Sequence, residues 1–341
     1  MRKSVGSRIA VAAVASLLVS TSLTAPAQAK PDRPVMLSTW FGVGAIPLPA
    51  GTPWKLEGVK VYDKGQRPVA TYHREDNSVT LSYIVFENLS GQPTGKGCQG
   101  DVIDPLAEHF KKTISGRADG EVKDAAGNAM ATTSYLLELA PGVKQKQHNL
   151  FGFVGTAKTC FEIHLSNVTS NPADETVMAE TLAAFRPELA YQPNAMDYFT
   201  LASLLFPTEP GSAAPYYKES LDRMSDGPES ITPRRVATDQ LVISLGMSGD
   251  LKNSRAVAEM AVAKDPDYPL NYYNLACADA EEGKAAEARL HLQQAFDQRA
   301  NVLPGEQMPD PVKDDSILKL KKDKAFWSWV QTLPRSGQPT A

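Results

Sequence analysis

The sequence predicts an α+β protein: an antiparallel sheet with packed helices in the N-terminal half, followed by an all-α region of repeated helix pairs. In the first half, apolar and polar residues alternate in short runs separated by turn residues, which is typical of hairpins in an antiparallel sheet. In the second half, residues of matching type recur 34 positions apart, which is typical of stacked helix pairs. We therefore expect two domains of different architecture.

The N-terminus has the features of a secretory signal peptide. The start is basic, with Arg2 and Lys3, residues 9–19 are apolar, and residues 27–29 read Ala-Gln-Ala. A membrane anchor is the alternative, but this apolar core is shorter than the ~20 residues that span a bilayer. We expect cleavage after Ala29 and a periplasmic or secreted mature chain with no membrane span.

Charge and length narrow the classes of function. The chain of 341 residues has a formal net charge of −4, which becomes −7 without residues 1–29, because these carry three basic and no acidic residues. An acidic chain suits neither nucleic acid nor an anionic membrane, so the expected partner is another protein. The length suggests more than one hydrophobic core. We expect an α+β domain over residues 30–190, a helical domain over 191–333 and a disordered tail over 334–341.

Strand-like runs dominate the first domain. A helix is expected at 104–114, a polar loop at 116–124 and a second helix at 174–189, which Pro187 ends. The expected strands cover residues 54–62, 67–74, 79–87, 129–140, 147–155 and 158–166. The order of these elements resembles that of small exported α+β domains of the PsbP-like or Mog1-like type.

The stretch TGKGCQGD at 94–101 has the spacing G-x-G-x-x-G, which also occurs in dinucleotide-binding turns. Such a turn directly follows a parallel strand. Here the residues NLSGQPT intervene, and the preceding strands are expected to be antiparallel. We therefore expect no cofactor. The alternative is a flexible loop whose glycines let Cys98 reach another strand, with Asp101 or Asp104 capping the following helix.

Export affects how the three cysteines are interpreted, because disulfides persist outside the cytosol. Cys98 and Cys160 both lie in the first domain. Their pairing is the simplest connectivity and would leave Cys277 buried and reduced. Spacing alone does not decide the connectivity.

Few residues suggest catalytic chemistry. The five histidines lack metal-binding spacing, so no metal site is expected. Cys160, Glu162 and His164 alternate along one strand and share a face, which would suit a nucleophile and a base. The favoured alternative is half of a disulfide beside two polar residues, and no catalytic residue is assigned.

The 34-residue period relates segments 237–269 and 270–302. Small residues let two antiparallel helices approach closely, and a glycine makes the turn between them. Three pairs of identical residues mark the period: Leu241 and Leu275, Gly249 and Gly283, and Ala261 and Ala295.

The second segment resembles the tetratricopeptide repeat (TPR). The residues that fit its pattern of large and small positions are Tyr272, Leu275, Ala276, Gly283, Ala288, Leu292 and Ala295. The first segment fits less fully, because Thr238 replaces the usual aromatic residue and Ser254 the usual small apolar one. A third, degenerate pair is expected at 196–206 and 212–224. A terminal amphipathic segment would cover the open end of the stack with Ile317, Leu318, Leu320, Phe326, Trp327 and Val330.

The resemblance implies a protein-binding concave face formed by the first helix of each pair. Binders of chaperone tails carry basic and Asn residues on this face. At the corresponding places this chain has Asp239, Ile243, Tyr273 and Cys277, and the only partial match is Asn274, so recognition of a carboxylate terminus is not expected. The hypothesis is an apolar or aromatic groove, with core packing as the alternative for each candidate: Tyr216, Ile243, Met247, Tyr273 and Asn274.

Two hypotheses for function follow. The first is an exported, non-enzymatic adaptor or scaffold that binds a partner protein through its repeats. The second is an envelope enzyme or small-ligand-binding protein with its site in the α+β domain, near Cys160, Glu162, His164 and residues 95–101. A purely structural envelope protein is a third possibility.

Overall fold

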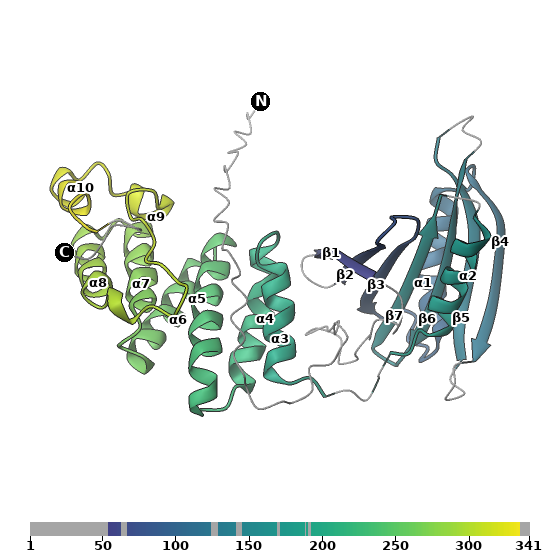
Figure 1. Cartoon of the computed structure of the whole chain (residues 1–341), viewed down its shortest axis with the longest axis horizontal. Coiled ribbons are helices and arrows are strands. Elements are labelled where there is room, and N and C mark those ends of the chain that lie inside the picture. The colour runs from purple at the N-terminus through teal and green to yellow at the C-terminus, as the bar shows by residue number, and fades with distance from the viewer. Residues whose placement is uncertain are drawn as a thin grey trace.

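A computed structural model describes residues 54–334 apart from 63–66, 124–128, 141–144, 169–170, 188 and 190–191. A β-sheet with two helices forms the N-terminal part and a row of helices forms the C-terminal part (Figure 1). This architecture confirms the predicted α+β fold class. The expected signal peptide, the expected domain boundary at 190–191 and residues 335–341 of the expected tail lie outside the described residues.

Seven antiparallel strands form one sheet in the order β1-β2-β3-β7-β6-β5-β4. The sheet consists of two hairpin-connected blocks, β1–β3 and β4–β7, which meet where β3 pairs with β7. The strands are β1 (Trp54–Tyr62), β2 (Arg67–Arg74), β3 (Thr80–Glu87), β4 (Ile114–Lys123), β5 (Ala129–Glu138), β6 (Lys146–Gly155) and β7 (Thr159–Asn167).

Strand β4 corrects the polar loop expected at 116–124. It pairs with β5 along its length and lies at the edge of the sheet (Figure 1). Most of its side chains are exposed, so neither face shows the apolar alternation by which strands are recognised. Charged side chains on an edge strand also oppose pairing with another chain. The polar composition of β4 therefore explains why no strand was predicted there, and it also suits a strand at the edge of the sheet.

Two helices cover opposite faces of this sheet. Successive strand residues point to opposite faces, so Cys160 faces one side of β7 while Phe161 and Ile163 face the other. Helix α1 (Gly95–His109) packs on the side of Cys160, against β5 and β6. Helix α2 (Pro172–Ala183) packs on the side of Ile163, against β6 and β7. The helix expected at 104–114 was therefore placed too late in the chain.

Six helices form three consecutive antiparallel pairs in the C-terminal part (Figure 1). The pairs are α3 (Ala195–Leu205) with α4 (Pro210–Arg223), α5 (Ile231–Met247) with α6 (Leu251–Lys264), and α7 (Pro269–Glu281) with α8 (Ala285–Asp297). The remaining helical segments are the 3₁₀ turns η2 (Pro228–Ser230) and η3 (Arg299–Asn301) and the short helices α9 (Asp315–Leu318) and α10 (Lys324–Val330).

The 34-residue period corresponds to equivalent positions in two of these pairs. Gly249 and Gly283 connect the helices of pairs α5–α6 and α7–α8 and have positive φ angles of 84° and 75°, a conformation that favours glycine. The matching residues Leu241 and Leu275 are buried, as are Ala261 and Ala295. Ser254 is also buried at the position of Ala288, and its hydroxyl donates to the Val242 carbonyl at 2.9 Å.

The two parts share one hydrophobic core. Helix α3 contacts β1, and buried side chains of the sheet, α2, α3 and α4 form a single cluster. Tyr83 stacks on Phe185 at a centroid distance of 5.8 Å, and Leu201 and Tyr216 belong to the same cluster. The first helix pair is therefore joined to the sheet by apolar packing.

Candidate functional site

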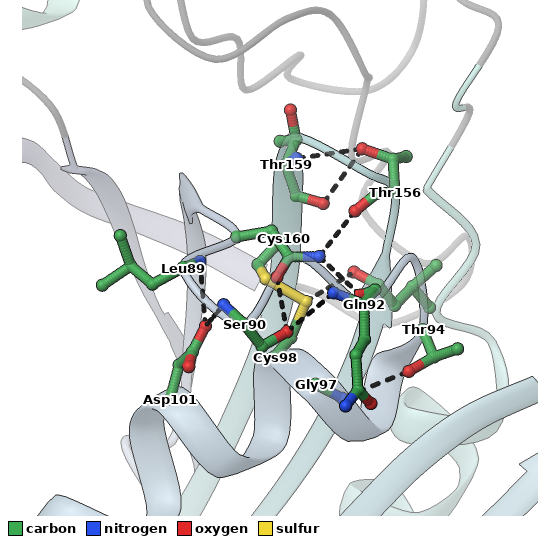
Figure 2. Close-up of a disulfide and its surroundings, with 12 residues drawn as sticks. Leu89, Ser90, Gln92, Thr94, Gly97, Cys98, Asp101, Thr156, Thr159 and Cys160 are labelled. Atoms are coloured by element: carbon green, nitrogen blue, oxygen red, sulfur yellow. Dashed lines mark hydrogen bonds between the residues drawn. A yellow bond between two sulfur atoms is a disulfide. The ribbon is translucent and has the colours of Figure 1, made fainter.

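The G-x-G-x-x-G stretch lies inside the first two turns of α1 and is not a flexible loop. A Cβ on Gly95 would lie 2.1 Å from the carbonyl oxygen of Phe153, so only glycine lets the helix start approach β6 this closely. Cys98, one turn on, forms a disulfide with Cys160 on β7 (Figure 2). Gly95 therefore allows α1 to pack closely on β6, and the disulfide links α1 covalently to β7.

Hydrogen bonds around the disulfide correct the expected capping by Asp101 or Asp104. The hydroxyl of Thr94 caps α1 by accepting from the Gly97 amide at 3.2 Å. Asp101 instead accepts from the backbone amides of Leu89 and Ser90, both at 3.1 Å, and so holds the segment before α1 (Figure 2). Asp104 forms an ion pair with Arg117 of β4.

The Cys160–Glu162–His164 row lies under α1 and offers no reactive thiol. Cys160 is bonded to Cys98. His164 stacks on Phe151 at a centroid distance of 4.1 Å and bonds to Asn149 at 3.0 Å. Burial lowers the pKa of His164 to about 4, so the ring is neutral at pH 7. The observation that motivated an enzymatic site in this domain is therefore absent.

The chain's own C-terminal segment covers the face of α7 that was assigned to the concave surface. It crosses α7 on its way to α9 (Figure 1). The Cys277 thiol lies 3.7 Å from Asp314, and burial raises the pKa of that thiol well above its usual value. Farther along α7, Glu281 accepts from Ser316 and pairs with Lys319. This part of the expected groove is filled by the protein itself.

The five candidate binding residues do not form one surface. Tyr216 is fully buried in the shared core, and Tyr273 is buried against the C-terminal segment. Asn274 is buried and donates to Asp239 at 2.8 Å, which links α7 to α5. Ile243 is partly buried. Met247, by contrast, is 61% exposed and lines a groove that the sequence analysis did not foresee.

This groove, called here the α4–α6 groove, lies over α5 and between α4 and α6. Its volume is about 1130 Å³. Met260 of α6 is 51% exposed at its wall, although large apolar side chains are usually withdrawn from water. The apolar residues that line it include Ala214, Leu221, Leu241, Leu245, Val257 and Met260.

Most charged side chains at the rim of the groove form ion pairs. The Arg235 guanidinium forms two hydrogen bonds to Asp265, at 2.6 and 3.0 Å. Lys218 pairs with Asp222 at 2.6 Å on α4. Arg234 donates to two backbone carbonyls and to Asp226. Glu209 and Lys264 also line the groove and form no ion pair among the described residues. The groove therefore presents an apolar interior with a rim of mostly paired charges.

Over residues 54–334, outside the gaps given above, no group of three or more His, Cys, Asp or Glu side chains is placed to hold a metal ion. Among the described helices, none is long and apolar enough to cross a bilayer. Exposed methionines on helix positions outside the repeat core, such as Met247 and Met260, were the sequence signal that could have indicated the α4–α6 groove.

Comparison with known proteins gives no family. No protein-family model matches the chain, and no curated protein sequence matches it.

Parts of the chain are similar to solved structures. The Sgt2 TPR domain from Aspergillus fumigatus is 16% identical, with a TM-score of 0.30, over 45% of this chain and 89% of that one. Cyanobacterial PsbP (CyanoP) from Synechocystis sp. PCC 6803 is 13% identical, with a TM-score of 0.34, over 48% of this chain and 98% of that one. A multi-domain immunophilin from Arabidopsis thaliana is 11% identical, with a TM-score of 0.28, over 72% and 99% respectively. At these values, no functional inference is drawn from the similarity.

Proposed function

We propose that this is an exported, non-enzymatic protein-interaction protein whose TPR-like helix pairs bind an apolar segment of a partner protein in the α4–α6 groove. The groove is the observation that carries the proposal. Its volume of about 1130 Å³ lies above the ~300–1,000 Å³ range of small-ligand pockets. Concave sites lined mostly by apolar side chains are typical of binding sites.

The ion pairs at the rim of the groove favour an apolar partner segment over a charged one. Arg235 and Lys218 are held by Asp265 and Asp222, so a charged ligand would have to compete with these pairs. An apolar side chain that displaces water from the groove contributes about 1.5–3 kcal/mol when fully buried. Micromolar binding needs about 8 kcal/mol net and association costs at least about 4 kcal/mol, so on the order of four to eight such side chains are needed.

The export part of the proposal is supported by the basic and apolar N-terminal sequence with its Ala-Gln-Ala pattern. The disulfide between Cys98 and Cys160 supports the same compartment, because such bonds persist in oxidising surroundings. The enzymatic alternative has no comparable support, since it relied on a Cys160 thiol that the disulfide consumes.

Affinity capture from the cells that make the protein tests this function. The tagged full chain is exported, captured under native conditions, and its partners are identified by mass spectrometry. Met260→Glu places a charge in the groove wall, and Leu290→Glu is the matched control, because Leu290 is 57% exposed on α8 outside the groove. We expect a stoichiometric partner whose recovery falls at least tenfold in the Met260 variant alone. Equal recovery with both variants would refute the groove as the site.

A further inference from the structure

An uncharged segment of the same chain directly precedes the sheet. Residues 34–53 read PVMLSTWFGVGAIPLPAGTP and contain no Asp, Glu, Lys, Arg or His. Trp40 and Phe41 stand side by side within it. An expected cleavage after Ala29 would leave this segment in the mature protein. Fully burying each large apolar side chain stabilises a protein by about 1.5–3 kcal/mol, so such a segment gains from an apolar binding surface.

The segment ends close to the helical part. Trp54 begins β1, β1 contacts α3, and α3 pairs with α4, which forms one wall of the α4–α6 groove. Neighbouring packed helices lie about 8–10 Å apart, so the path from α4 across α5 to α6 is about 20 Å. An extended chain advances about 3.3 Å per residue, so twenty residues reach up to about 66 Å. Residues 34–53 are long enough to enter the groove without displacing β1.

The chemistry of the segment matches that of the groove. The interior is formed by side chains such as Leu245, Val257 and Met260, and two ion pairs at the rim are Lys218–Asp222 and Arg235–Asp265. A ligand without charges leaves those pairs intact, whereas an acidic or basic one would disturb them. The groove volume of about 1130 Å³ is large enough to accommodate several large side chains.

We infer that the resident occupant of the α4–α6 groove is residues 34–53 of the same chain, and that a partner gains access by displacing them. The first statement rests on the segment and the groove. The second rests on the proposed function, because it needs a partner that uses this groove. Residues 34–53 then act as an intramolecular competitor that lowers the apparent affinity for the partner by the fraction of time the groove is filled.

Cross-linking in the full chain tests the occupancy. In a Cys277→Ser background, Phe41→Cys is combined with Met260→Cys and treated with a short bifunctional maleimide. The control combines Phe41→Cys with Leu290→Cys, which is similarly exposed but lies outside the groove. We expect the first pair to form an intramolecular cross-link at least tenfold faster than the control. Equal rates, or a cross-link that joins two copies, would overturn the inference.

A competition measurement keeps the test independent of folding defects. Added synthetic peptide of residues 34–53 should slow the cross-link between positions 41 and 260, because it competes for the same groove. A cross-link that the peptide leaves unchanged would contradict specific docking. Neither measurement requires a partner, so a successful cross-link without any captured partner would remove the proposed function and keep the occupancy. A captured partner without the cross-link would do the reverse.

Discussion

Removing the disulfide should destabilise the sheet domain more than any surface change does. The perturbation is the double substitution Cys98→Ala with Cys160→Ala, which leaves no unpaired thiol in this domain. The two cysteines are separated by 62 residues, and closing a loop of that length costs the unfolded chain about 4 kcal/mol in the chain-entropy description. Native disulfides usually contribute about 2–5 kcal/mol, so the expected loss lies in that range.

Hydrogen exchange gives a readout specific to this domain. The backbone amides of Phe161 and Ile163 lie in β7, between β3 and β6, and exchange there reports unfolding of the sheet. The matched control is Cys277→Ala, because Cys277 is the free cysteine of the helical part. A loss below about 0.5 kcal/mol in the double variant, or an equal loss in the control, would refute the reasoning.

Three further predictions concern the helix start and the buried charges. Gly95→Ala should destabilise the sheet domain by about 1–3 kcal/mol in urea unfolding, because its Cβ would lie 2.1 Å from the Phe153 carbonyl oxygen. Burial raises the pKa of Asp239 from 3.8 to about 6, so the folded state keeps this proton where the unfolded state releases it. Its contribution to stability is present at low pH and lost as pH rises through about 6, and Asp239→Asn should flatten that slope in thermal unfolding measured from pH 4 to 7. Arg255→Met should cost the helical part about 2–3 kcal/mol, because the buried Asp279 loses a partner at 2.6 Å.

The Gly95 and Arg255 predictions each have a control in the same chain. Gly100→Ala adds a Cβ whose nearest neighbour is 3.8 Å away, so it should be neutral or stabilising in α1. Lys218→Met breaks an exposed pair and should cost under about 1 kcal/mol. Burial also raises the pKa of Asp314. Part of the pH dependence of stability should therefore remain in the Asp239→Asn variant. Equal effects in a variant and its control would contradict the explanation offered for that variant.

Periodic patterns predicted the elements that bury one face. The alternation in Thr80–Glu87 and the matching Gly249 and Gly283 depend on local geometry, which the sequence displays directly. Strand β4 could not be found in this way, because its pairing with β5 is a tertiary contact and both its faces are mostly exposed. The early start of α1 was missed because glycine has a low helix propensity, which the packing of Gly95 on β6 overrides.

The candidate site was less predictable than the fold. The repeat spacing predicts that Tyr273 and Cys277 lie on the inner face of α7. It does not predict that Asp314 and Ser316, which are distant in the sequence, cover that face. The α4–α6 groove depends on how far two non-consecutive helices stand apart, which depends on the packing of all three neighbours. Met247 and Met260 line the groove and lie outside the repeat core, and of these two only Met247 was among the predicted binding residues.

Equilibrium binding of the captured partner tests the central claim most directly. The purified full chain, Met260→Glu and Leu290→Glu would be titrated against the labelled partner by fluorescence anisotropy. The account predicts at least tenfold weaker binding for the Met260 variant, equivalent to about 1.4 kcal/mol or more, and binding within twofold of the unaltered chain for the Leu290 variant. Unchanged affinity of the Met260 variant would contradict the claim that the α4–α6 groove binds the partner.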